Sequence, residues 1–117
     1  MPFMLLIIEP AGQRRERTED EGRQLYDRML RFSAELAAEG VLQAAQSLRT
    51  DAEGVRVQRR RGARTLVDGP FSESKEMVGG FFLLDCATRE EAVAIASRCP
   101  AAEWAMVEVR ELGPCFT

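Results

Sequence analysis

The residues best suited to chemistry lie together in residues 68–76, DGPFSESKE. Ionisable side chains of both signs fall in this segment, at Asp68, Glu73, Lys75 and Glu76. Loops held by a rigid scaffold often carry binding groups, and Lys75 is the only lysine in the chain, so a neighbouring carboxylate could hold or tune it. In this interpretation Asp68 is the candidate general base or ligand acceptor, and Lys75 is a candidate anion contact.

Turn chemistry explains the same segment without any ligand. An aspartate such as Asp68 can accept hydrogen bonds from its own downstream backbone, Gly69 accepts a positive φ, and Pro70 fixes φ for the next corner. Phe71 would then pack the loop onto the core, and Lys75 would form an exposed salt bridge, which contributes little to stability. Both interpretations stay open on the sequence alone.

A second charged pair lies near the C-terminus. Residues 104–112 alternate with a period of two, which predicts a strand with Val107 and Val109 on one face and Glu108 and Arg110 on the other. The charged pair could form a cross-strand contact, or it could face a dimer cavity and meet the aspartate of the DGPF segment. The candidate ligand-binding residues are therefore Asp68, Gly69, Pro70, Phe71, Glu73, Lys75, Glu76 and Arg110.

The composition excludes several kinds of site. The chain has 117 residues and no histidine, so it lacks the commonest metal ligand and the commonest general base near neutral pH. Three cysteines, Cys86, Cys99 and Cys115, show no C-x-x-C spacing, and their odd number fits reduced thiols in a cytoplasm. No catalytic triad, P-loop, Rossmann fingerprint or metal-ligand set appears, so we expect no cofactor and no metal.

Charge and hydropathy bear on the partners. Arginines in residues 56–64 could bind phosphate groups, but the formal net charge of -3 and the few aromatic residues nearby argue against nucleic acid. Arginines at the tip of a hairpin more often keep an exposed sheet edge from aggregating. The apolar residues 3–8 are too few to span a membrane, which takes about 20, and they lack the features of a signal peptide. We expect a cytoplasmic protein that contacts neither nucleic acid nor membrane.

Hydrophobic periodicity predicts the elements that position these groups. Residues 3–8 are continuously apolar, which is typical of a strand buried on both faces, and residues 13–17 indicate a polar loop. Thr18 and Glu21 form a capping box that begins a helix, and Gly40 ends that helix. The apolar stripe of the helix consists of Leu25, Met29, Phe32 and Leu36.

The second half of the chain follows the same plan. A strand with a bulge is expected over residues 41–48, and a hairpin over residues 55–67. Residues 68–80 are interpreted as a long loop or lid, and residues 81–84 as a second all-apolar strand. A repeat of the capping box over residues 88–91 begins a second helix. The predicted buried face of that helix consists of Ala92, Val93, Ile95 and Ala96.

Two β-α-β halves around an inserted hairpin predict one domain over residues 1–117 with an α+β, ferredoxin-like fold, an antiparallel sheet with both helices on one face. Yet residues 3–8 and 81–84 are apolar at every position. Because monomers rarely expose apolar patches larger than a few hundred Å², we predict a two-fold homodimer in which a second sheet covers the open face, a dimeric α/β barrel. Alternatively, the hairpin and loops fold over that face.

The sequence resembles the DGPF branch of the YCII-related protein family. The string DGPFSESKEMVGGFFLLD carries the likeness, together with FMLLII, AAEGVL, TREEAVAIASRCPAA and MVEVREL, so it extends over nearly the whole chain. The resemblance implies a ferredoxin-like dimeric α/β barrel, similar to muconolactone isomerases and small monooxygenases. Some relatives have a His-Asp pair in a cleft, which does not carry over to a chain without histidine. DGPF-type members are often encoded beside extracytoplasmic-function sigma factors, which implies a regulatory or accessory role.

Two functions stay open. The first is a homodimeric small-molecule-binding or regulatory accessory protein, in which the DGPF loop stabilises the dimer. The second is a small cofactor-independent enzyme, isomerase-like, lyase-like or monooxygenase-like, with Asp68 as the catalytic residue in the cleft between sheet and helices. A loop packed shut by Phe71 favours the first function, and an open pocket with converging polar groups favours the second.

Overall fold

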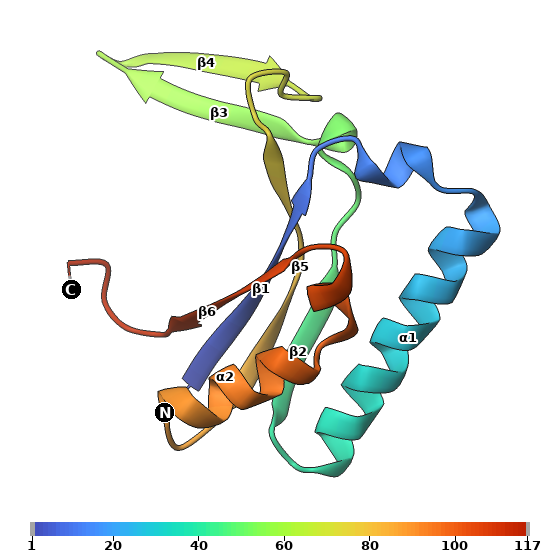
Figure 1. The fold of residues 1–117 in the computed structure, drawn as a ribbon. Helices are drawn as coiled ribbons and strands as arrows, with labels where there is room; N and C mark the ends of the chain where they lie inside the picture. The colour runs from blue at the N-terminus through green and yellow to red at the C-terminus, as the bar shows by residue number, and fades with distance from the viewer. Residues whose placement is uncertain (1, 117) are drawn as a thin grey trace.

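The computed structural model describes residues 2–116, which form six β-strands and two α-helices (Figure 1). The strands are β1 (Pro2–Pro10), β2 (Leu42–Ser47), β3 (Val55–Arg60), β4 (Ala63–Asp68), β5 (Glu76–Asp85) and β6 (Met106–Glu111). The helices are α1 (Glu19–Ala38) and α2 (Arg89–Arg98), and short 3-10 turns cover Gln13–Glu16, Asp51–Glu53 and Pro100–Glu103. The order of strands and helices is the predicted one.

Four antiparallel strands form the main sheet, in the order β2-β5-β1-β6. With the β3–β4 hairpin set aside, this is the strand order of a ferredoxin-like fold, in which the two β-α-β halves interleave. Both helices pack on one face of the sheet, because Phe32 of α1 and Ile95 of α2 join one buried cluster with Leu5 of β1. The α+β, ferredoxin-like prediction is confirmed.

The alternation along β1 separates the two faces of the sheet. Phe3, Leu5 and Ile7 are buried beneath the helices, whereas Met4 and Leu6 point the other way and are only half-buried. The prediction that both faces of the sheet are shielded from water is therefore correct for the face that the helices cover. Within a single chain it is not correct for the opposite face. We call this second face the open face.

The first helix is capped as predicted. The Glu21 backbone N–H donates to the Thr18 hydroxyl at 3.1 Å, and the Thr18 N–H donates to the Glu21 carboxylate at 2.8 Å. The second box is only half formed. The Glu91 N–H donates to the Thr88 hydroxyl, but the Glu91 carboxylate accepts from the N–H of Ala87 instead of closing the box.

Several predicted boundaries differ from the structure. β4 includes residue 68 and β5 begins at Glu76, so the expected loop over residues 68–80 is reduced to residues 69–75. The reason is sheet pairing, because Glu76 pairs with Pro10 at the far end of β1 and extends β5 through the two glycines. The predicted bulge in β2 is confirmed by a register shift between Leu42 and Ala44.

Two further details of the second half need correction. The last strand begins at Met106, because Trp104 ends the 3-10 turn that follows α2. Val93 lies on the solvent side of α2 and is 39% exposed, whereas Ala92, Ile95 and Ala96 are buried as predicted. A ten-residue helix presents only a narrow stripe to the sheet, and Val93 falls outside it.

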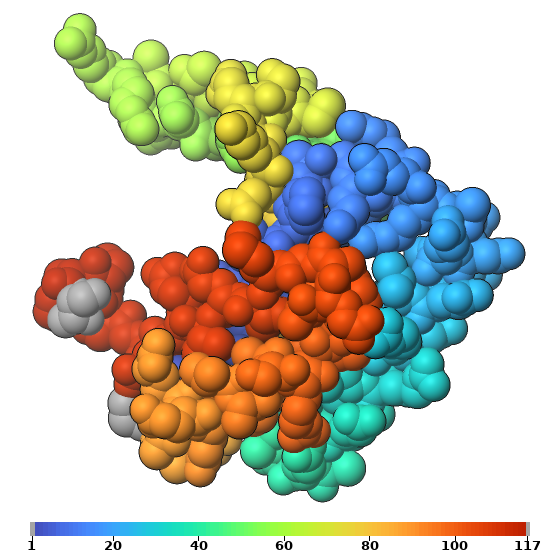
Figure 2. Space-filling view, in the orientation of Figure 1, coloured from blue at the N-terminus to red at the C-terminus, as the bar shows by residue number. Residues whose placement is uncertain are grey.

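The β3–β4 hairpin forms a separate two-stranded sheet that projects from the body on the side away from α1 (Figures 1 and 2). Every residue of both strands is exposed. The radius of gyration is 16.0 Å, compared with about 13.4 Å for a globular chain of this length. The hairpin therefore leaves the open face of its own chain uncovered.

Candidate functional site

A cavity of 710 Å³ lies between α1 and the sheet. One wall is the first half of α1, the floor comes from β1, β2 and β5, and one end is closed by the turn that carries Trp104. Its apolar lining includes Leu25, Tyr26, Met29, Phe82 and Trp104. Its charged lining consists of Glu9, Arg14, Arg17, Glu19 and Arg23.

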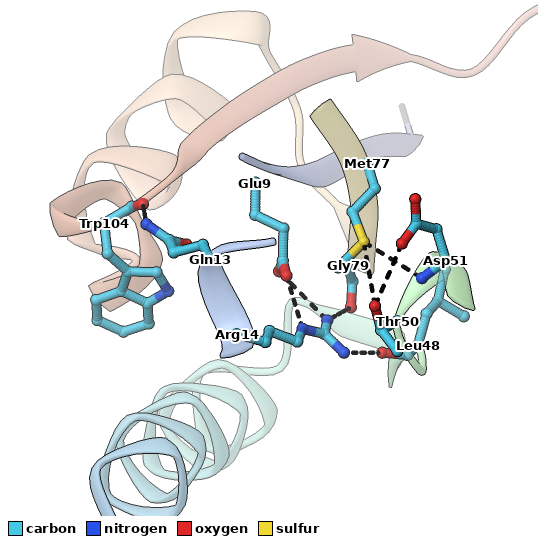
Figure 3. Close-up of polar contacts among 9 residues, drawn as sticks. All are labelled: Glu9, Gln13, Arg14, Leu48, Thr50, Asp51, Met77, Gly79 and Trp104. Carbon is cyan, nitrogen blue, oxygen red and sulfur yellow. Dashed lines mark hydrogen bonds and ion pairs between the residues drawn. The ribbon is translucent and has the colours of Figure 1, made fainter. Parts of the chain in front are cut away.

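Glu9 is a buried acid at the end of β1, only 6% exposed. Arg14, from the 3-10 turn that follows, donates from Nε to Oε1 at 2.6 Å and from Nη2 to Oε2 at 3.3 Å (Figure 3). The same guanidinium donates to the carbonyl oxygens of Leu48 at 2.8 Å and Gly79 at 3.3 Å. The ion pair thus joins β1, the end of β2 and the start of β5, and it neutralises a carboxylate that would be costly to bury alone.

The backbone at Gly79 makes room for this ion pair. The β1–β5 register shifts between Ile7 and Ile8, which leaves Gly79 as the extra residue of a β-bulge. A side chain at this position would place Cβ 2.1 Å from Oε2 of Glu9 and 3.0 Å from Nη2 of Arg14. The bulge needs glycine here because the two charged groups occupy the space of a methyl group.

Trp104 borders the other side of the cavity. The Gln13 side-chain amide donates to the Trp104 carbonyl oxygen at 2.7 Å, which holds the turn in place (Figure 3). Two guanidinium groups lie over the indole, Arg28 at 5.4 Å and Arg17 at 6.0 Å from the ring centroid. Arg28 is bound to Glu103, and this contact raises the pKa of the arginine and lowers the pKa of Glu103.

The DGPF segment lies outside this cavity. Asp68 is exposed at the end of β4, opposite Val55, and lines neither of the cavities described in residues 2–116. Gly69 does not have the positive φ that turn chemistry predicts. It is required for another reason, because a Cβ there would lie 1.8 Å from the carbonyl oxygen of Asp51. The next residue, Pro70, is exposed and follows a cis peptide bond.

Phe71 packs the loop shut. Its ring is half-buried beneath the guanidinium of Arg56, 3.9 Å from the ring centroid, and its backbone N–H donates to Asp51 Oδ2 at 3.4 Å. Arg56 also donates to Ser74 Oγ at 3.0 Å. This is the arrangement that the accessory function leads one to expect. Lys75 is expected from the sequence to form an exposed salt bridge. Within the part of the chain that the structure describes, the Lys75 side chain forms no ion pair, so this prediction is wrong.

The remaining predicted residues do not converge. Glu73 is exposed, while Glu76 lines a separate 400 Å³ hollow at the base of the hairpin together with Phe71. Arg110 pairs with Met4 on the open face and forms an ion pair with Glu108 of its own strand at 3.1 Å, not a cross-strand contact. Met4 is six residues from the end of β1 that faces the loop, about 20 Å along a strand. Within one chain Arg110 therefore does not meet Asp68.

None of the residues that line the large cavity is among the predicted site residues. The prediction for residues 13–17 is a polar loop, whereas that segment supplies Arg14 and Arg17 to the cavity lining. Its Gln13 holds the turn of Trp104 beside the cavity. One signal could have found the site. In the alternation that buries Phe3, Leu5 and Ile7, the next position is an acid, Glu9, and a charge on a buried face needs a partner nearby.

The described residues contain no group of three or more His, Cys, Asp or Glu side chains that could hold a metal ion. Across residues 2–116, neither helix combines the length and the apolar character that crossing a bilayer requires. Cys86 and Cys99 are buried, and burial is the largest cause that raises the pKa of each thiol, while Cys115 is exposed.

Residues 1–115 match the YCII-related domain. The chain belongs to the YCII-related family. A stretch of 35 residues is 49% identical to an uncharacterized protein of Rhizobium meliloti (strain 1021), and this match covers 30% of the YCII-related chain and 28% of that protein. The fold is similar to that of the 5-chloro-2-hydroxyhydroquinone dehydrochlorinase from Burkholderia phenoliruptrix AC1100, solved in complex with 2,5-dihydroxybenzoquinone. That likeness has a TM-score of 0.56 and 16% identity and covers 97% of this chain and 94% of the other, so it concerns the fold alone.

Proposed function

We propose that this YCII-related protein is a homodimer that binds a small organic molecule in the cavity between α1 and the sheet. The observation that carries the proposal is the cavity itself. Its volume of 710 Å³ falls within the roughly 300–1,000 Å³ of small-molecule sites, which combine apolar walls with a few polar groups. Tyr26, Met29 and Trp104 give this cavity apolar and aromatic walls, and the charged groups lie toward the end of β1.

The geometry favours binding over catalysis. Both carboxylate oxygens of Glu9 accept hydrogen bonds from Arg14, so this acid is engaged in a structural ion pair. The chain has no histidine. Asp68, the candidate general base, is exposed and remote from the cavity lining. These observations support the regulatory or accessory function, in which the link to an extracytoplasmic-function sigma factor stays a prediction.

A cofactor-independent enzyme is the second candidate. The structural similarity to a dehydrochlorinase that holds a quinone supports it, because a shared fold can present a cleft in the same place. In this alternative, Asp68 of the DGPF loop stays the candidate proton acceptor, although it does not line the cavity of its own chain. The two candidates differ in one measurable respect, which is whether Asp68 affects what happens in the cavity.

The open face of the sheet supports the homodimer. Its side chains come from directly paired positions of β1, β5 and β6. The apolar ones are Met4, Leu6, Ile8, Val78, Phe81, Leu83 and Met106, and none of them is buried. The ion pair of Glu108 and Arg110 lies on the same face, at the edge that β6 forms. Val78 is 43% exposed and Met106 is 56% exposed. A contiguous apolar surface of this kind marks an interface, and a second copy of the same sheet is its simplest complement.

The projecting hairpin supports the same partner. Val57 lies directly opposite Leu66, and these side chains are 62% and 52% exposed. A two-stranded hairpin is at best marginally stable alone, so an apolar surface on it needs a cover. Residues 55–68 contain five arginines and one aspartate, which gives them a formal charge of +4. Because the net charge of the chain is -3, the other residues together carry a charge of -7. In a dimer each basic hairpin can lie along the acidic body of the other copy.

The cavity is tested by filling it. A Cβ at Gly22 of α1 meets nothing within 4 Å, and this residue lines the cavity, so Gly22→Leu adds bulk there without a backbone clash. Benzyl alcohol, benzoate and 2,5-dihydroxybenzoquinone serve as probes in thermal-shift measurements. At least one probe should raise the Tm of the wild type and of Gly22→Ala but not of Gly22→Leu. Equal shifts in all three proteins, or no shift with any probe, would contradict a ligand site in this cavity.

The dimer is tested by its mass in solution. Light scattering at micromolar concentration should give twice the 13.1 kDa of one chain. Leu6→Glu on the open face should give one chain, whereas Ala34→Glu on exposed α1 should not change the mass. Val57→Glu is a second variant that leaves the core untouched, because Val57 is exposed in the single chain. A wild-type mass of 13.1 kDa would refute the homodimer.

A further inference from the structure

The charged residues of the cavity do not cancel. Three arginines and two glutamates line it. Arg14 is paired with Glu9, and Arg23 donates to Glu19 at 2.8 Å. The guanidinium of Arg17 forms no ion pair and no hydrogen bond with any residue between 2 and 116. One positive charge is therefore left in the lining, and it belongs to Arg17.

Glu21, the acid whose pKa is lowered in part by the charge of Arg17, does not neutralise this arginine. Hydrogen bonds from Thr18 are the main reason that the pKa of Glu21 is lowered, and the charge of Arg17 adds only the smallest contribution. Glu21 is engaged in the capping box at the start of α1. It is also absent from the cavity lining. An anion inside the cavity would thus be the direct partner of Arg17.

The backbone holds Arg17 in place before any ligand arrives. Arg17 follows the 3-10 turn, and its N–H donates to the carbonyl oxygen of Arg14 at 3.4 Å. The next residue, Thr18, caps α1. The segment is thereby fixed at both sides, by the buried ion pair of Arg14 and by the helix. A positioned cation loses less freedom when it binds an anion than a mobile one does.

The aromatic side chains of the lining favour a flat ligand. The guanidinium of Arg17 lies over the ring of Trp104. The N–H donors of a guanidinium lie in its own plane, so stacking on an aromatic ring leaves them able to bind an anion. Tyr26 and Trp104 both border the cavity, and Phe82 and Met29 contribute to its apolar lining. An inorganic anion would leave these apolar surfaces bare. A ring would cover them and bring its charged substituent to the arginine.

We infer that the cavity takes a small planar ring compound with one negative charge, such as an aromatic carboxylate, whose charged group binds Arg17 and whose ring packs beside Trp104. The inference rests on the proposed function, since it names the chemical class of the ligand of that cavity. The paired charges add nothing to the selection. Arg17 alone accounts for the preference for a monoanion.

Three probes of similar size separate charge from shape: benzoate, benzyl alcohol and benzylamine. Titration calorimetry of the wild type should give a Kd for benzoate at least about tenfold below that for benzyl alcohol, since a hydrogen bond to a charged group contributes about 1.5–3 kcal/mol and 1.4 kcal/mol is tenfold. Benzylamine should bind more weakly than benzyl alcohol. Added salt should weaken benzoate binding and leave benzyl alcohol binding unchanged.

Variants assign the effect to one residue. Arg17→Gln should weaken benzoate binding about tenfold and leave benzyl alcohol binding unchanged. Arg17→Lys keeps the charge but loses the planar, forked guanidinium, so its affinity for benzoate should lie between those of the wild type and Arg17→Gln. Arg31→Gln is the matched control and should change neither affinity, because Arg31 is exposed on the same helix, α1, and does not line the cavity. Circular dichroism verifies that each variant is folded.

The outcomes distinguish this inference from the proposed function. If benzyl alcohol binds as tightly as benzoate, or if Arg17→Gln leaves benzoate binding intact, the cavity is a ligand site and the monoanion inference is overturned. If none of the probes binds the wild-type protein, both the cavity function and the inference fail. If Arg31→Gln weakens benzoate binding as much as Arg17→Gln does, the effect comes from the overall charge of the protein and the assignment to Arg17 is wrong.

Discussion

A methyl group at Gly79 should destabilise the protein by breaking a contact that the sequence does not reveal. The substitution Gly79→Ala places Cβ 2.1 Å from Oε2 of Glu9. Ordinary contact begins at 3.4 Å, so the carboxylate must retreat by 1.3 Å. Its 3.3 Å hydrogen bond to Nη2 of Arg14 is then lost, and the 2.6 Å bond to Nε must bend or lengthen.

The magnitude lies between two limits. Breaking a fully buried ion pair costs about 3–5 kcal/mol, whereas a surface pair contributes about 0–1 kcal/mol. The Glu9 side chain is 8% exposed and that of Arg14 is 32% exposed, so water can reach one partner. We expect Gly79→Ala to lower the free energy of unfolding by about 2 kcal/mol, or Tm by about 8 °C at about 4 °C per kcal/mol.

Urea denaturation followed by circular dichroism measures this loss. The protomer concentration must be the same for all variants, because the stability of a homodimer depends on it. Gly22→Ala is the matched control, since it makes the same chemical change inside α1 where a Cβ meets nothing within 4 Å. Its helix propensity should raise the stability by up to about 1 kcal/mol. The two glycines are thus expected to respond with opposite signs.

A double-mutant cycle tests the cause. In an Arg14→Met background the ion pair is already absent, so Gly79→Ala should cost less than half of its cost in the wild type. An equal cost in both backgrounds would refute the reasoning, because the damage would then come from the bulged backbone and not from Glu9. A wild-type stability for Gly79→Ala alone would also refute it.

Three further predictions concern other parts of the chain. Burial raises the pKa of the Cys99 thiol, so brief iodoacetamide treatment near neutral pH should modify exposed Cys115 and leave Cys99 intact by mass spectrometry. The hydrogen bond from Arg28 lowers the pKa of Glu103, so this carboxylate stabilises the fold above its unfolded pKa and the benefit is lost as pH falls through the folded pKa. The stability difference between wild type and Glu103→Gln should therefore shrink in urea titrations as the pH falls below the ordinary glutamate pKa of 4.5. Asp68→Ala should leave benzoate binding unchanged in calorimetry, and a lost affinity would instead favour the enzyme.

The regular elements could be predicted from the sequence because local chemistry determines them. The hydroxyl of Thr18 marks the start of α1 and the positive φ of Gly40 marks its end, and both act on residues only a few positions away. The extent of β5 could not be predicted, since two glycines and a polar start resemble a loop until β1 offers them a partner strand. Val93 was misplaced because a short helix has too few turns to define its buried stripe.

The candidate site was harder to predict because its parts are distant in the sequence. Glu9 and Arg14 are only five residues apart, but the third component, Gly79, meets them only through the register of a bulged strand pair. Sequence chemistry pointed to the DGPF segment, where Gly69 is in fact required by the close approach of the Asp51 carbonyl. Turn-forming residues and ligand-binding residues look alike in a sequence, because both kinds are small, polar or charged.

The buried ion pair connects the stability of the fold to the cavity. Arg14 joins three segments through Glu9, Leu48 and Gly79, and three residues later the chain delivers Arg17 to the cavity. A hydrogen bond from the Arg17 N–H to the Arg14 carbonyl oxygen connects the residue of the buried ion pair to the residue that lines the cavity. The pair that neutralises Glu9, the one buried acid among residues 2–116, thereby also places the one arginine of the cavity lining that forms no ion pair. Residues 13–17 are therefore polar because they supply an ion pair and a cavity residue, and not only because they form a loop exposed to solvent.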